Sequence, residues 1–200
     1  MRVASLIILC LALAAIPAVA DVNNGPINGS VDGWTINFGY VVSNTFVPDG
    51  GKVTGFMFGA WLFPGDTLTS VDWSITSDEF GGTVYGAGTA SGANLVDSFI
   101  SSNQYGYNID LVTVSGLNVD VTPETTYWLN LSNAVVESGD PVYWDENSGP
   151  AIASESSLGT IASEAFTVNT VPGTTPEPGS ILLFGSGILG LAGLLRRRLL

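Results

Sequence analysis

Apolar and polar residues alternate through most of the chain after residue 33, and this period of two predicts β-strands. Residues 34–42, WTINFGYVV, show the pattern most clearly, with one side holding Trp34, Ile36, Phe38, Tyr40 and Val42. The same alternation runs through residues 70–76, 105–114 and 127–131. In residues 105–114 the side expected to face inward holds Tyr105, Tyr107, Ile109 and Leu111. Residues 53–63, VTGFMFGAWLF, are apolar on both sides, which predicts a strand covered on each face.

Clusters of Gly, Pro, Asp and Asn separate these apolar runs and indicate turns. They lie at residues 48–51, 64–66, 81–82, 138–141 and 147–150. About eight to ten short strands at this spacing predict an all-β fold, an antiparallel β-sandwich with a jelly-roll-like order, over residues 21–168.

The first twenty residues have the pattern of a secretory signal peptide. Arg2 precedes an apolar run, and small residues at Ala18 and Ala20 predict cleavage before Asp21. The apolar run is short for a membrane span, so an uncleaved anchor is the weaker alternative. We therefore expect export of the mature chain by Sec-type machinery.

The other end of the chain predicts a membrane segment. A linker over residues 169–178 leads to an uncharged apolar stretch at residues 179–195, which is close to the length of a transmembrane helix. Residues 196–200 form a basic tail with Arg196, Arg197 and Arg198, the charge that favours the cytoplasmic side. A buried core helix, or an ordinary single-span anchor, is the alternative.

The order of these C-terminal features resembles the PEP-CTERM sorting signal of bacterial exosortase substrates. Pro176, Glu177 and Pro178 are followed by the short apolar segment and then by the arginine cluster. The resemblance covers about residues 174–200. It implies that a membrane exosortase processes the chain near Pro176–Pro178, with the arginines acting as a stop. It also implies a transient membrane anchor, followed by residence in the cell envelope or extracellular matrix.

The net negative charge of the central part of the chain limits the kinds of partner that it can bind. All eighteen carboxylates lie between Asp21 and Glu177, where Lys52 is the only basic side chain. Such a strongly acidic segment repels phosphates, so nucleic acid is not an expected partner. The single cysteine, Cys10, lies in the predicted signal peptide, so no disulfide is expected in the mature chain.

The absence of histidine excludes a Ser-His-Asp triad and histidine metal sites. A pair of carboxylates, as in glycosidases, is the remaining catalytic arrangement. The adjacent pairs Asp78–Glu79 and Asp145–Glu146 do not fit, because neighbouring strand residues point to opposite faces. We therefore expect no enzyme activity, name no catalytic residue, and predict no cofactor.

Residues 140–149, DPVYWDENSG, place several oxygen ligands close together. Asp140, Asp145, Glu146 and Asn147 have the side chains that calcium prefers, but their spacing does not match an EF-hand loop. A turn between two strands is the simpler interpretation. No metal site is assigned.

Five tryptophans offer flat apolar surfaces. Trp34 and Trp73 lie on predicted core faces, whereas Trp128 and Trp144 are the better candidates for outward positions. The sequence thus predicts an exported, exosortase-sorted envelope or matrix protein with a non-catalytic structural or adhesive body. The alternative is a secreted module that binds or hydrolyses extracellular polysaccharide.

Overall fold

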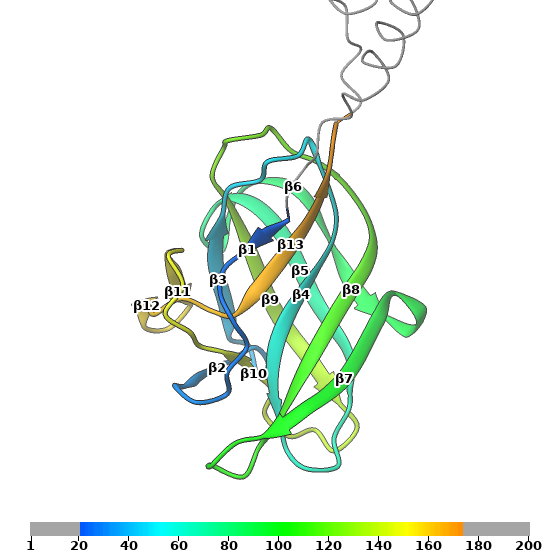
Figure 1. The fold of residues 1–200 in the computed structure, drawn as a ribbon, viewed down its shortest axis with the longest axis vertical. Coiled ribbons are helices and arrows are strands. Elements are labelled where there is room, and N and C mark those ends of the chain that lie inside the picture. The colour runs from blue at the N-terminus through cyan, green and yellow to red at the C-terminus, as the bar shows by residue number, and fades with distance from the viewer. Residues whose placement is uncertain (1–20, 174–200) are drawn as a thin grey trace, which may run out of the picture.

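Two antiparallel β-sheets lie face to face in the computed structural model, which describes residues 21–173 (Figure 1). In the first sheet β4 is central, with β8 and then β7 on one side. On its other side β4 pairs with β13 and with β10, which continue to β1 and β2 respectively. The strands are β1 (Val22–Asn23), β2 (Gly33–Thr35), β4 (Lys52–Leu62), β7 (Leu95–Ser102), β8 (Asn108–Asp120), β10 (Tyr143–Asp145) and β13 (Phe166–Val171).

The second sheet has the order β12-β11-β3-β9-β5-β6. The short 3-10 helix η1 (Gly92–Asn94) joins its last strand to the first sheet. The prediction of an all-β antiparallel sandwich is therefore confirmed. The strands are β3 (Val41–Phe46), β5 (Leu68–Asp78), β6 (Gly81–Ser91), β9 (Tyr127–Val136), β11 (Ala153–Glu155) and β12 (Gly159–Ile161).

The order of the strands differs from that of a jelly roll, whose two Greek keys join strands by longer connections. Here β5 and β6 form a hairpin in one sheet, and β7 and β8 form a hairpin in the other. The two residues between β5 and β6 are Glu79 and Phe80, and so short a connection can only join neighbouring antiparallel strands. The jelly-roll part of the prediction is therefore wrong.

The core lies between the sheets and is almost entirely apolar. Its β4 side chains, Phe56 and Phe58, meet Ile75, Leu129 and other residues from the second sheet. Trp144 of β10 is fully buried there against Phe58 and Phe166, so its predicted outward position is wrong. Trp128 does point away from the buried Tyr127–Leu129–Leu131 side and is half-buried, as expected. Trp34 and Trp73 are partly buried against the core.

The single strand predicted over residues 34–42 is two strands in different sheets. Between β2 and β3 the chain turns at Phe38 and Gly39, which have φ values of 56° and 88°. Asn37 holds this turn, because its side chain donates to the Asp140 carbonyl and accepts from the Val142 amide. Phe38 is 63% exposed as a result, and Tyr40 is also exposed.

The alternation in residues 105–114 is real, but the side predicted to face inward is the outer one. Val112 and Val114 of β8 belong to the core, whereas Ile109 lies opposite Trp61 on the outer face of the sheet. The N-terminal segment 24–33 covers this outer face. Gly29, with φ of 60°, lies so close to the Ile109 side chain that any Cβ there would overlap it. β4 is thus covered on both faces, as its sequence predicts.

Both ends of the described chain lie at the same edge of the sandwich. β1 pairs with β13, and the Asp21 carboxylate accepts hydrogen bonds from the Thr170 amide and the Asn169 side chain. β13 continues to Val171, so the predicted linker begins later than residue 169. Within residues 21–173 no helix is long and apolar enough to cross a membrane. The predicted signal peptide and membrane segment lie outside the described residues.

Candidate functional site

A cleft of about 390 Å³ opens on the outer face of the first sheet, at the end where β4 terminates. Its size falls in the range of small-molecule sites, roughly 300–1,000 Å³. Four aromatic rings and one carboxylate dominate its walls. The lining residues are Val31, Asp32, Gly33, Trp61, Tyr105, Tyr107 and Tyr143.

Neighbouring strands place two of these rings side by side. Tyr143 of β10 is the register partner of Trp61 of β4, so both side chains project from the same face of the sheet. On the other side of β4, Ile109 of β8 is the register partner of Trp61. Tyr105 and Tyr107 lie just before β8 in the sequence, so this pairing brings them close to Trp61. Sheet pairing thus assembles side chains that are up to 82 positions apart in sequence.

The rings form a continuous aromatic cluster. Trp61 stacks on Tyr105 with centroids 5.8 Å apart and an interplanar angle of 21°. Tyr107 lies 5.7 Å from Trp61 and 5.5 Å from Tyr143, in both cases measured between ring centroids. Its edge-on contact with Phe63, at 4.9 Å, extends the cluster into the loop after β4. Such tilted and offset contacts are the favoured geometries of aromatic pairs.

A short turn presents Tyr105 to solvent. The Asn103 side-chain oxygen accepts hydrogen bonds from the amides of Tyr105 and Tyr107, each at 3.0 Å. Gly106 completes the turn with φ of 89°. Asn and Gly are the residues that such a turn requires, because Asn caps the following amides and Gly tolerates positive φ. Tyr105 remains 56% exposed, with its inner face on Trp61.

Asp145 joins the two walls of the cleft. It is fully buried, and Oδ1 accepts from Trp61 Nε1 at 2.6 Å and from the Gly29 amide at 3.0 Å. Oδ2 accepts from the Asn28 amide at 2.9 Å. One carboxylate therefore fixes the Trp61 ring and the start of the loop that supplies residues 31–33. Burial raises the pKa of Asp145, and the three hydrogen bonds act in the opposite direction.

Gly33 forms the inner surface of the cleft. A Cβ at this position would lie 3.0 Å from the Tyr143 Cβ and 3.3 Å from the Trp61 ring. Both distances are shorter than ordinary Cβ contacts, so any larger residue would require its neighbours to shift. The glycine thus leaves open the space between these two aromatic residues and the Asp32 carboxylate, whose Oδ1 accepts from the Gly33 amide.

Hydrogen bonding between tyrosines stabilises the back of the cleft. The pKa of Tyr143 is raised to about 12, mainly by burial and to a smaller extent by a hydrogen bond with the Tyr107 side chain. Tyr143 therefore remains neutral over the physiological pH range and can act as a donor or acceptor.

Three of the four side chains considered as calcium ligands, Asp145, Glu146 and Asn147, accept hydrogen bonds within the protein. Besides Asp145, Glu146 Oε2 accepts from Trp34 Nε1 at 2.8 Å. Asn147 Oδ1 accepts from the Gly149 amide at 2.7 Å, which is the turn geometry that the sequence offers as the alternative to calcium. Residues 21–173 contain no group of three or more acidic, histidine or cysteine side chains placed to hold a metal ion.

Glu164 is the most unusual carboxyl group of the body. It is fully buried, and neither of its carboxyl oxygens has a hydrogen-bond partner. Burial, together with the charges of Glu146, Asp145 and Asp32, raises its pKa well above the ordinary value. Folding therefore favours the protonated form of this side chain. No pattern in the sequence around residue 164 indicates this burial.

Two carboxyl groups do meet across strands, Asp97 of β7 and Asp110 of β8. Burial, the charge of Asp97 and a hydrogen bond between the two side chains raise the pKa of Asp110 to about 7. Asp97 Oδ2 accepts from the Leu68 amide at 2.7 Å, whereas Asp97 Oδ1 and Asp110 Oδ1 are buried without a hydrogen-bond partner. The adjacent acids Asp78 and Glu79 are both exposed at the end of the β5–β6 hairpin.

The residues singled out from the sequence for sorting lie mainly outside the described part. These are Ala18, Ala20, Pro176, Glu177, Pro178 and Arg196–Arg198. Asp21, the residue after the predicted cleavage point, is the exception, and it is exposed beside β13. The sequence interpretation did not identify the cleft. Its only local signal is the aromatic pair in NQYGYN at residues 103–108, where a turn precedes a strand.

Replacing Asp145 by Asn should lower the stability of the whole cleft region. An amide cannot accept from three N–H donors as a carboxylate does, and its NH₂ group would face one of them. We expect a loss of roughly 1–3 kcal/mol in the free energy of unfolding, measured by urea denaturation. The exposed Glu79→Gln serves as the control that removes one charge. Equal stability of the two variants would contradict the role given to Asp145.

The Glu164→Gln variant should change how stability depends on pH. A carboxyl group whose pKa is raised by folding binds its proton more tightly in the folded state, so wild-type stability falls as pH rises above the unfolded value of about 4.5. Glutamine cannot ionise, and the variant should lose this decline above about pH 4.5. Urea denaturation across this range measures it, with Glu79→Gln as control. A slope identical to that of wild type would rule out a buried, protonated Glu164.

Comparison with known families identifies a motif in the C-terminal part of the chain. Residues 174–198 match the model of the PEP-CTERM protein-sorting motif. This match begins directly after the described body and includes the Pro-Glu-Pro sequence, the apolar segment and the arginines. No curated protein matches the chain. The chain therefore carries a PEP-CTERM protein-sorting motif at residues 174–198, which confirms the resemblance that its sequence shows there.

Proposed function

We propose that the protein is exported by Sec-type machinery and processed by an exosortase, and that its body then acts as a non-catalytic structural or adhesive module outside the cell. The sorting motif at residues 174–198 carries the first part of this proposal. A membrane enzyme must reach the Pro-Glu-Pro sequence, and prolines at 176 and 178 keep that sequence out of a regular helix.

The geometry of the body is compatible with such processing. β13 ends at Val171, and the chain leaves the sandwich there, only a few residues before Pro176. In Figure 1 this exit lies at one end of the long axis. A body attached in this way would extend from the membrane along its strands and remain intact after cleavage near Pro176–Pro178.

The long edge strands support a role in assembly. β6 closes the second sheet and β7 closes the first, and they have eleven and eight residues. β6 contains no charged residue and no proline, the features that usually protect an edge from pairing with another chain. The edge strands β2 and β12, on the opposite sides of the two sheets, have only three residues each, and so short an edge offers little backbone for pairing with another chain.

Exposed apolar side chains accompany these two edges. Val84 and Tyr85 of β6 and Phe99 and Ile100 of β7 are all exposed. An uncharged edge beside apolar groups favours antiparallel pairing with the same strand of a second copy, since backbone groups supply hydrogen bonds and the side chains lose contact with water. We propose that β6 mediates such self-association.

The engagement of the carboxylates supports a non-catalytic body. Asp145 and Glu146 accept hydrogen bonds from tryptophan side chains, and Asp97 accepts one from the Leu68 amide. These groups stabilise the fold. The proposal therefore assigns no reaction to them.

The Val84→Lys variant tests the role of β6. Lysine on an edge strand opposes pairing, so the dissociation constant for self-association should rise at least about tenfold, a change of 1.4 kcal/mol. Leu158→Lys is the matched control, because Leu158 has a similar exposure of 65% against 58% for Val84 and lies outside both long edges. Sedimentation of the full chain in detergent measures the association. An equal effect of both substitutions would contradict pairing through β6.

A further inference from the structure

The aromatic cleft has a combination of surfaces that suits one class of ligand. Tyr105 offers the outer face of its ring, since Trp61 stacks on the inner one. Asp32 offers carboxylate oxygens at the cleft wall, and Tyr107 and Tyr143 also line the cleft and carry hydroxyl groups. An apolar ring face combined with hydroxyl and carboxylate acceptors fits a molecule with both C–H faces and O–H donors.

We propose that this cleft binds a neutral pyranose unit of an extracellular polysaccharide. The C–H face of the sugar stacks on Tyr105, and its hydroxyl groups donate to Asp32. The volume of about 390 Å³ accommodates a single sugar ring with neighbouring units extending outward. The inference rests on the proposed export of the body, because an extracellular polysaccharide is accessible only to a protein outside the cell.

Charge determines which sugars fit. Asp32 lies in the cleft, Asp145 accepts hydrogen bonds from the Asn28 and Gly29 amides of the loop wall, and the Glu146 amide donates to the Asp32 carbonyl. Lys52 is the only basic side chain in residues 21–173, and it lies near the opposite end of β4. An acidic sugar would meet carboxylates with no compensating cation, so uronic acid polymers are excluded from the cleft.

A proline-rich peptide is the other ligand that aromatic grooves take. The Asp32 carboxylate favours the sugar, because prolines lack the N–H donors that would replace its water, whereas a pyranose carries several hydroxyl donors. The last strand of the described chain also ends far from the cleft. Val171 pairs with Lys52, and the nine residue steps from Lys52 to Trp61 span roughly 30 Å of extended strand.

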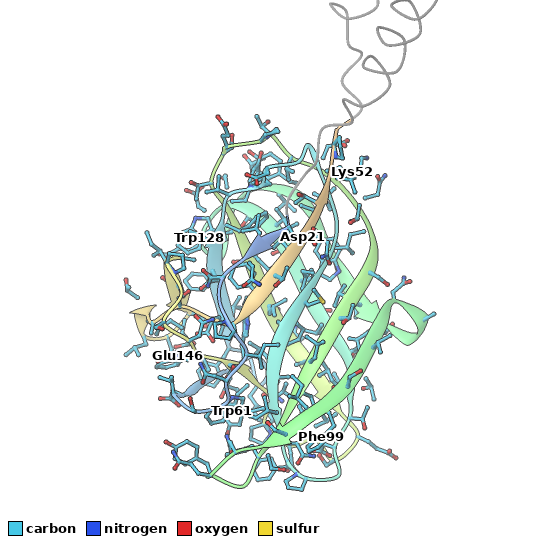
Figure 2. All side chains as sticks on the ribbon, in the orientation of Figure 1. Asp21, Lys52, Trp61, Phe99, Trp128 and Glu146 are labelled. Atoms are coloured by element: carbon cyan, nitrogen blue, oxygen red, sulfur yellow. The ribbon has the colours of Figure 1, made fainter. Side chains whose placement is uncertain are left out.

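The position of the cleft suits a polymer outside the cell. Figure 2 shows Trp61 near one end of the molecule, whereas Lys52 lies near the other end, where the described chain stops. A body held by its C-terminal end therefore presents the cleft away from the membrane. Binding there leaves the processing site and the β6 edge free.

Titration of the full-length protein in detergent with neutral oligosaccharides tests the proposal. Maltohexaose, cellohexaose and mannohexaose are the probes, hexagalacturonic acid is the acidic comparison, and a peptide of residues 171–179 is the proline-rich one. Tryptophan fluorescence reports on Trp61, and isothermal titration calorimetry gives the dissociation constant. We expect saturable binding of at least one neutral hexasaccharide and none of the acidic one.

Two substitutions separate this site from nonspecific contact. Tyr105→Ala should weaken binding at least about tenfold, because it removes the stacking surface. Phe99→Ala is the matched control, since Phe99 is 61% exposed and lies outside the cleft lining, and its affinity should equal that of wild type. Thermal unfolding of each variant verifies folding. Val84→Lys should also bind normally, so failure of self-association and failure of sugar binding are separate results.

The proposal is overturned if none of the three neutral hexasaccharides binds. It is equally overturned if folded Tyr105→Ala binds as tightly as Phe99→Ala, or if hexagalacturonic acid binds better than the neutral sugars. Tighter binding of the proline-rich peptide would identify the cleft as a peptide site instead.

Discussion

A buried carboxylate without a cation is the constraint on which the rest of the structure depends. Asp145 has no lysine or arginine partner, and the body offers only Lys52, which pairs with Asp120 at the surface. Two backbone amides and the Trp61 indole instead satisfy the charge. Because an unpaired buried charge is very costly, the N-terminal segment and the Trp61 ring must stay in these positions for the sheet to form. The cleft is a direct consequence.

Strand alternation predicted much of the fold because burial on one face leaves a clear period of two. Residues 127–131 follow it fully, with Trp128 outward and its neighbours in the core. It failed at residues 34–42, where the turn depends on hydrogen bonds from Asn37 to residues more than 100 positions away. It also failed to choose the inner face at residues 105–114, because the N-terminal segment makes the outer face of β8 apolar as well. The cleft could not be predicted from the alternation either, because its walls come from four segments that are far apart in the sequence.

The chain exit, the aromatic cleft and the long edge strands occupy different parts of the body. The chain leaves at one end toward the PEP-CTERM motif, the aromatic cleft lies near the other end, and the long edge strands β6, which is uncharged, and β7 close the two sheets. This separation means that processing, self-association and ligand binding would not compete for the same residues. It also explains how one small sandwich could act in a matrix, with attachment, assembly and polymer contact on distinct surfaces.

The intact mass of the protein isolated from its native host tests the central claim most directly, because both ends contribute to one number. The account predicts a chain that begins at Asp21 and ends near Pro176–Pro178, so that the remaining protein is the sandwich with a short tail. A mass that retains Arg196–Leu200 would contradict it. The protein would then be a permanent membrane protein, and its C-terminal motif would not be processed by an exosortase.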